Sequence, residues 1–273
     1  MYREQNIRSW TASLNNLWRM SITFLFAILG AFAPADDAAA ELTARANHDR
    51  IKIDFFYHGS TVSISGISDP GADLIITMTS AEGHQALKKK GKVAGFLWMN
   101  VGDMKFEHVP NMYAVHSTRK IDDILSPGEM EKYVIGYPAL GKHIEMTPAL
   151  SGEERDRWFN EFVKFKEASK LYTTSAGKVT TAMENGKQKY YILTAWPYQA
   201  PPGDYIVTVY AVKDKTIVEK AEAKVRVEHA GVVKTLFDMA KNNAGLYGAI
   251  SIIAALGAGF GVGLVFGKGG GAH

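Results

Sequence analysis

The last part of the chain contains an uninterrupted run of apolar and small residues, 246–266, without a single charged side chain. A helix needs roughly 20 apolar residues to cross the hydrocarbon core of a bilayer, and this run has that length. Its one ordinary polar residue, Ser251, can donate a hydrogen bond to a carbonyl one turn earlier. The sequence therefore predicts a transmembrane helix over residues 246–267, followed by a short cytoplasmic tail over residues 268–273.

Small residues recur along this predicted helix. The glycines are Gly257, Gly259, Gly261, Gly263 and Gly267. Three of them (259, 263 and 267) are spaced every fourth residue and fall on nearly one helix face, where small side chains let two helix backbones approach closely. We predict a helix-packing face that contacts a membrane protein partner or a second copy of the chain. A glycine-rich helix that contacts only the lipid bilayer is the alternative.

The first 40 residues have the organisation of a signal peptide. Its basic residues are Arg3, Arg8 and Arg19. An apolar segment over residues 20–32 follows, and then small residues with A-x-A patterns that end at Ala35 and Ala40. We predict a cleaved signal peptide over residues 1–40, with an uncleaved signal anchor as the alternative. A signal first and an anchor last predict a single-pass protein of the bacterial inner membrane with its main domain in the periplasm.

Charge and cysteine content restrict the function of the exported part. The 31 basic residues barely exceed the 28 acidic ones, and this balance does not favour nucleic acid as a partner. The densest basic run, Lys88 to Lys90 with Lys92, is bounded by glycines and indicates a solvated turn, with binding of an anionic lipid or substrate as the alternative. Because cysteine is absent, disulfides, thiolate metal sites and cysteine nucleophiles are excluded.

The pattern from residue 51 onward is typical of β structure. Runs that alternate or are mostly apolar, separated by turn residues, predict strands over 51–59, 60–68, 72–80, 92–100, 111–118, 189–197, 203–212 and 217–229. About eight short strands at such spacing indicate a mainly β fold, an immunoglobulin-like antiparallel β-sandwich over residues 41–228. In the strand over 203–212, we expect one face of the sheet to be wetter than the other.

A helical insertion is predicted at about residues 121–176, over one edge or end of the sandwich. Ser151 and Glu154 form a capping-box pattern, and aromatic residues follow at helical spacing from Trp158 to Phe165. A face of this kind is more typical of a core than of a ligand surface. Residues 229–245 are predicted to form an amphipathic linker into the membrane helix.

One group of methionine and histidine residues suggests a metal site. No serine-hydrolase elbow, zinc-protease, phosphate-loop or dinucleotide motif is present, so we predict neither an enzyme nor a cofactor. Thioether and imidazole groups together suit copper. The candidate ligands are Met104, His108, Met112 and His116, with Met99 and His84 nearby in sequence. The alternative is that the methionines fill the core and His116 faces solvent.

Several short motifs, taken in succession, resemble a known family. They are Phe56-x-x-Gly59, Val62-x-Ile64-x-Gly66, Trp98-x-Asn100, Pro110-x-x-Tyr113-x-x-x-Ser117-x-Arg119, Pro202-Gly203-x-Tyr205 and Leu246-Tyr247-Gly248. Their order is similar to that in the family of putative transmembrane proteins first grouped from alphaproteobacteria, although Lys120 stands where we expect proline. The resemblance implies topology rather than chemistry. It also implies a transport accessory, since such proteins are often encoded beside sulfite-exporter-like permeases.

Two function hypotheses follow from the sequence. The first is a non-enzymatic, membrane-anchored periplasmic module that binds or scaffolds a membrane partner, such as a permease. The second is a periplasmic solute- or copper-binding protein with a site between the sandwich and the helical insertion.

Overall fold

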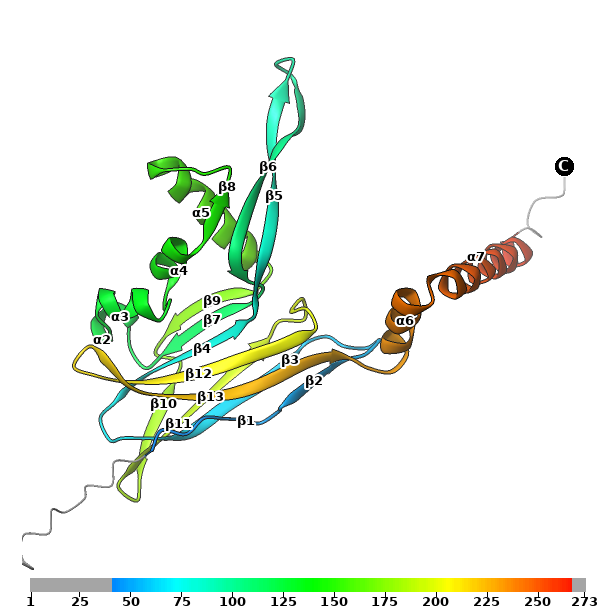
Figure 1. Cartoon of the computed structure of the whole chain (residues 1–273). Coiled ribbons are helices and arrows are strands. Elements are labelled where there is room, and N and C mark those ends of the chain that lie inside the picture. The colour runs from blue at the N-terminus through cyan, green and yellow to red at the C-terminus, as the bar shows by residue number, and fades with distance from the viewer. Residues whose placement is uncertain (1–40, 267–273) are drawn as a thin grey trace, which may run out of the picture. The chain divides into compact units, whose positions relative to one another are not determined.

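The computed structural model describes residues 41–266 (Figure 1). The signal peptide predicted over residues 1–40, Gly267 and the tail predicted over residues 268–273 lie outside the described residues. The described part is mainly β and ends in one long apolar helix, as expected.

Three sheets make up the β structure. The first, sheet A, has the order β1 (Arg45–Ala46), β3 (Ser60–Ser68), β11 (Lys187–Trp196) and β10 (Thr180–Glu184). Sheet B has the order β2 (Arg50–Ile53), β13 (Thr216–His229), β12 (Gly203–Lys213), β4 (Asp73–Ser80), β7 (Tyr113–Ser117) and β9 (Tyr172–Ala176). Sheet C has the order β5 (Glu82–Val93), β6 (Leu97–Pro110) and β8 (Glu145–Thr147).

Sheets A and B share one hydrophobic core. Side chains of a strand point alternately to its two faces, and every second residue of β11 is buried while its neighbours are exposed. Ile192 and Trp196 of β11 belong to the same buried cluster as Ile76 and Val209 of sheet B. Sheets A and B therefore enclose this core face to face, while the immunoglobulin-like type of the predicted sandwich stays a prediction.

The other face of sheet B is covered by a second hydrophobic core. Ile75, Val115 and Tyr210 of this sheet pack with residues of sheet C and the helices, including Phe106 and Phe162. Because sheet B is buried on both faces, β4 has a nearly continuous apolar run. The expectation that one face of β12 would be wetter is wrong, since Tyr210 and Val212 lie under this second layer.

Four short or medium helices form that layer: α2 (Ile121–Ile124), α3 (Pro127–Lys132), α4 (Tyr137–His143) and α5 (Gly152–Ala168). In α5 the aromatic stripe is used for the core, since Phe159 and Phe162 are buried, while Phe165 is half-exposed. Ser151 is the N-cap residue of α5, but its side chain makes no capping hydrogen bond. The helices cover a face of sheet B, whereas we expected them to cover an edge or an end.

Two strand pairs depart from the antiparallel prediction. β2 pairs with β13 in parallel, and β7 pairs with β9 in parallel. The remaining pairs of sheets A, B and C are antiparallel. The two parallel pairs lie at the two edges of sheet B, so its centre keeps the predicted antiparallel pairing.

The strand predicted over residues 92–100 is wrong. The chain reverses direction at residues 94–96, between β5 and β6, where Ala94 and Gly95 both have positive φ. These residues form the tip of a long hairpin that projects past α5 and β8 (Figure 1). The lysine run predicted as a turn lies instead within β5. Apolar residues at the exposed tip of this hairpin have the same pattern as a buried strand.

The C-terminal segment contains two helices, α6 (Gly231–Asn242) and α7 (Ala244–Phe266). The predicted amphipathic linker corresponds to α6, whose Phe237 ring lies tilted against that of His229 at the end of β13, with ring centroids 4.9 Å apart. The 23 residues of α7 span about 35 Å at about 1.5 Å per residue. Ser251 donates a hydrogen bond to the Tyr247 carbonyl at 2.8 Å, as the sequence suggested.

Candidate functional site

The four predicted copper ligands lie in separate environments. Met104 is buried in the core under the helices, whereas Met112 is buried in the core between sheets A and B. His108 is half-exposed, and its Nδ1 lies 3.3 Å from Glu82 Oε2. Within residues 41–266 no group of three or more His, Asp or Glu side chains is arranged to hold a metal ion. Since sheet B separates the two methionines, the structure does not bring the four side chains together.

Met99 and His84, which are near the candidate ligands in sequence, also do not converge with them in space. Met99 is half-exposed at the hairpin tip, and His84 is exposed on β5. The structure adds a partner that sequence reasoning missed, because His143 Nε2 lies 2.7 Å from Glu82 Oε1. Glu82 therefore bridges His108 and His143, which are 35 positions apart in the sequence.

His116 is a buried bridge between the two sheets of the sandwich. It projects from β7, its Nδ1 lies 2.6 Å from Ser175 Oγ, and its Nε2 lies 3.4 Å from Thr194 Oγ1. Burial, together with the smaller effect of the nearby Lys178 charge, lowers the pKa of His116 to about 4. Because its pKa is low, this imidazole is neutral at neutral pH. Both of its ring nitrogens are within hydrogen-bonding distance of hydroxyl groups. The expectation that His116 faces solvent is wrong.

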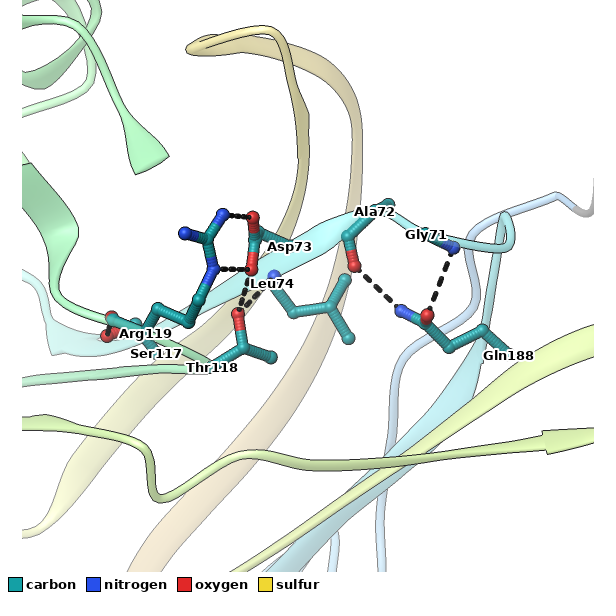
Figure 2. A network of polar contacts seen from close by, with 8 residues as sticks. All are labelled: Gly71, Ala72, Asp73, Leu74, Ser117, Thr118, Arg119 and Gln188. Atoms are coloured by element: carbon teal, nitrogen blue, oxygen red, sulfur yellow. Dashed lines mark hydrogen bonds and ion pairs between the residues drawn. The ribbon is translucent and has the colours of Figure 1, made fainter. Parts of the chain in front are cut away.

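Polar contacts tie the start of β4 to its neighbours (Figure 2). The Arg119 guanidinium pairs with both carboxylate oxygens of Asp73, and Thr118 Oγ1 donates to Asp73 Oδ1 at 2.8 Å. The hydrogen bond from Arg119 lowers the pKa of Asp73 below its usual range. On the other side, buried Gln188 donates to the Ala72 carbonyl at 2.7 Å. Each polar group has a protein partner, which identifies the network as a structural one.

A cleft of about 760 Å³ lies between the sandwich and the C-terminal end of α5. Its walls come from the start of β3, the end of β11, β9 and the residues that follow α5. Threonines 61, 173, 174 and 194 place hydroxyl groups on it, and Lys170 and Lys178 add positive charge near Glu167. The indole Nε1 of Trp196, which also lines the cleft, is buried without a hydrogen-bond partner among the described residues. The sequence placed a site in this region but named none of these residues.

The glycine face of α7 is open. An added Cβ at Gly257, Gly259, Gly261 or Gly263 would meet nothing within 4 Å in the described structure. Large apolar side chains such as Ile253 and Phe260 are also exposed along the helix. Within residues 41–266, α7 is the one helix long and apolar enough to cross a membrane, and none of its described residues is buried against the rest of the chain.

A second exposed apolar surface, which the sequence did not reveal, lies at the tip of the β5–β6 hairpin. Its members are Val93, Phe96, Leu97, Trp98, Met99 and Val101, and each is at least 43% exposed. We call this set the hairpin tip. A signal was present in the sequence, because the apolar run follows four lysines and is interrupted by Gly95.

Within residues 41–266, a mainly β domain is followed by one helix long and apolar enough to cross a membrane, which is the organisation of a membrane-anchored protein. The model of a family described as "Putative transmembrane protein" (Alph_Pro_TM) matches residues 41–268. The chain therefore belongs to this family, and the resemblance drawn from its motifs is confirmed. No curated protein and no solved structure matches the chain significantly.

Most residues that carry the family resemblance have structural roles. The Tyr113 hydroxyl donates to the Val134 carbonyl at 2.8 Å and accepts from the Gly136 amide at 2.7 Å, which ties the helices to sheet B. A Cβ on Gly66 would lie 1.9 Å from a backbone carbonyl oxygen. Trp98 differs from these residues, since it lies exposed on the hairpin tip.

Proposed function

We propose that this protein is a non-enzymatic binding or scaffolding module, held on the periplasmic side of the bacterial inner membrane by α7. The observation that carries the proposal is the unburied, 23-residue apolar surface of α7. Exposing such an apolar surface to water is unfavourable in free energy, and a bilayer or a membrane partner would remove it from water. Family membership supports the anchoring. The partner is proposed to be a membrane permease, to which this chain is an accessory subunit.

An immunoglobulin-like sandwich of variable type is proposed for the exported part. In support, sheet A has the order β1-β3-β11-β10, and β2 pairs in parallel with β13 at the edge of sheet B. The corresponding strands in such a domain are A-B-E-D and A′-G-F-C-C′, and β9 occupies the next place in the sheet, although it pairs with β7 in parallel. The Tyr205 hydroxyl also donates to the Pro201 carbonyl at 2.6 Å, four residues upstream near the start of β12. This contact resembles the tyrosine corner of immunoglobulin-like domains.

The proposed partner contact is the glycine face of α7. Small residues four apart let a second helix approach closely, and dispersion contacts then accumulate along the shared face. The test is a mild-detergent pull-down of the full-length, C-terminally tagged protein, with mass spectrometry of the intact chain and its companions. We expect a retained permease and a mature mass that begins after the signal peptide.

Two variants make the pull-down specific. Gly263→Leu places a bulky side chain on the glycine face, whereas Val262→Leu adds the same residue at an exposed position about 100° around the helix from both Gly261 and Gly263. We expect Gly263→Leu to reduce recovery of the partner and Val262→Leu to leave it unchanged. Equal recovery with both variants would exclude the glycine face as the contact, and a chain recovered alone would contradict the scaffolding function.

The cleft beside α5 supports a second function, the binding of a small periplasmic solute. Two lysines and several threonines line the cleft and suit an anionic solute that accepts hydrogen bonds. A bound solute would raise the melting temperature by mass action. A panel of small oxyanions, tested on the full-length protein and on a Lys178→Gln variant, is the test. No shift in the wild-type protein would exclude these ligands.

A further inference from the structure

The apolar side chains of the hairpin tip are not buried by the rest of the fold. Phe96 is 78% exposed and Trp98 is 63% exposed, although both are large and apolar. β8 pairs with β6 at residues 105–107, and Met104 packs into the core under the helices. Residues 92–103, which lie closer to the turn, are all exposed. From Lys88 to the turn, a strand rising about 3.3 Å per residue extends about 20 Å. The tip can therefore reach a surface that the body of the domain does not contact.

The strand register gives the two faces of the tip different chemistry. Val93 pairs with Leu97 and Gly91 with Met99, which places the apolar side chains of these pairs on one face. Lys92 pairs with Trp98 on the other face, and its Nζ lies 5.5 Å from the centre of the indole ring. Val101 packs where Gly91 lacks a side chain, since a Cβ there would lie 2.8 Å from Val101 Cγ2.

Positive charge lies along β5 at the base of the tip and, through Lys92, beside Trp98 within it. We call Lys88, Lys89, Lys90 and Lys92 the lysine collar. Between residues 88 and 103 the hairpin has four lysines and one acidic residue, Asp103, which pairs with Lys88 at 2.9 Å. Lys89, Lys90 and Lys92 have no ion pair within the described structure. An apolar end with tryptophan, followed by lysines about one headgroup layer away, is the pattern of segments that enter a membrane interface.

We propose that the hairpin tip inserts into the interfacial region of a bilayer that contains anionic phospholipids. The apolar pairs and the turn extend about 10 Å, which matches the depth of about 5–10 Å at which apolar faces enter the headgroup boundary. The lysine collar then lies at the level of the phosphates. The chain itself provides the surface, because α7 tethers the domain to a membrane and raises the local concentration of lipid.

Charge distinguishes lipid from the other occupants of such a surface. Lysine is depleted from the buried centre of protein–protein interfaces, whereas it is favoured beside an anionic bilayer. Two identical tips would bring two lysine collars together, and like charges oppose this pairing. A lipid surface accepts both the apolar tip and its collar. The inference rests on the anchoring by α7 proposed above.

The test uses the full-length chain, which contains no cysteine, reconstituted in lipid nanodiscs. A nitroxide is attached after Ala94→Cys at the tip or, as the matched control, after Asn185→Cys at the β10–β11 turn. Both positions are turns with nearly the same φ, 56° and 52°. The accessibility of each label to oxygen and to a nickel chelate is measured in nanodiscs of phosphatidylcholine, with and without phosphatidylglycerol.

When phosphatidylglycerol is present, we expect the label at position 94 to become more accessible to oxygen and less accessible to the nickel chelate. The accessibilities of the label at position 185 should remain those of a site in water. Replacing Lys89, Lys90 and Lys92, which have no ion pair in the described structure, by Gln should weaken the membrane insertion of the tip about fivefold per lysine. Phe96→Ser with Trp98→Ser should abolish it, whereas Met183→Ser on the other hairpin should not. Because these side chains are exposed, the variants keep the urea midpoint of the wild type.

Three results would overturn the inference. The first is a label at position 94 that stays aqueous in anchored protein with phosphatidylglycerol. The second is protection of this label only when a co-purified protein is present, which would assign the tip to a protein partner. The third is spin–spin broadening between two labelled tips, which would assign it to a second copy. Protein that fails to remain with the nanodiscs would instead contradict the anchoring by α7.

Discussion

His116 makes the stability of the sandwich depend on pH in a defined window. The imidazole is fully buried between Ser175 and Thr194, and its pKa in the folded protein is about 4, against an ordinary value of 6.5. As the pH falls below 6.5, the unfolded chain binds a proton at this residue while the folded protein does not. The folded state therefore loses stability between pH 6.5 and 4, and the loss levels off below pH 4.

The size of this effect follows from the two pKa values. They differ by about 2.5, and each pKa unit corresponds to about 1.4 kcal/mol, so the full loss is about 3 kcal/mol. About 2 kcal/mol of it should appear between pH 7 and 4.5. Asp73 and Asp204 also have lowered pKa values, and their contributions are lost only as the pH falls through lower values. The window above pH 4.5 thus isolates His116.

The assay is urea unfolding of the full-length protein in a neutral detergent, followed by tryptophan fluorescence, since Trp196 is buried in the core between the sheets. His116→Gln removes the titrating group and keeps an amide for the hydroxyl partners. This variant should be less stable than the wild type at pH 8 and should lack the loss between pH 7 and 4.5. His84→Gln, at an exposed position, should keep the loss. Equal slopes in the wild type and in His116→Gln would refute the reasoning.

Three further substitutions test the two cores and the sandwich, each by the same unfolding assay. Phe162→Ala removes a fully buried ring under the helices and should cost about 3–5 kcal/mol; a loss below about 1 kcal/mol would contradict the second core. Gly66→Ala should destabilise because its Cβ would lie 1.9 Å from a carbonyl oxygen, whereas Gly83→Ala, with 3.9 Å of space, should be tolerated. Tyr205→Phe removes a hydrogen bond and should cost about 1 kcal/mol, while Tyr191→Phe on the exposed face should cost nothing measurable.

Local patterns in the sequence predicted much of the fold. The strand over residues 60–68 has the same bounds as β3, because strict alternation between buried and exposed positions is set within one strand. The membrane helix was predicted over 246–267 and is observed over Ala244–Phe266, because its length and lack of charge are local properties. The amphipathic linker and the long helix from Ser151 were predictable for the same reason.

Features that depend on distant partners could not be predicted in the same way. Gln188 of β11 pairs with Ser68 of β3 across 120 positions, and no local pattern specifies such a pairing. The environment of His116 depends on β9 and β11, which follow it by many residues. The sequence predicts one strand over residues 92–100 because exposed and buried apolar residues have the same identity in sequence. The structure instead reverses the chain at Gly95 and leaves these residues exposed.

The most direct test of the account is the location of the main domain relative to the membrane. A cysteine at position 185, in the β10–β11 turn, is treated with a membrane-impermeant maleimide on intact spheroplasts, and membranes are then extracted with carbonate. We predict labelling from outside, with the protein retained in the membrane pellet, and release of a chain truncated after Asn243 into the periplasmic fraction. Labelling only after lysis, or carbonate extraction of the full-length protein, would contradict a periplasmic domain anchored by α7.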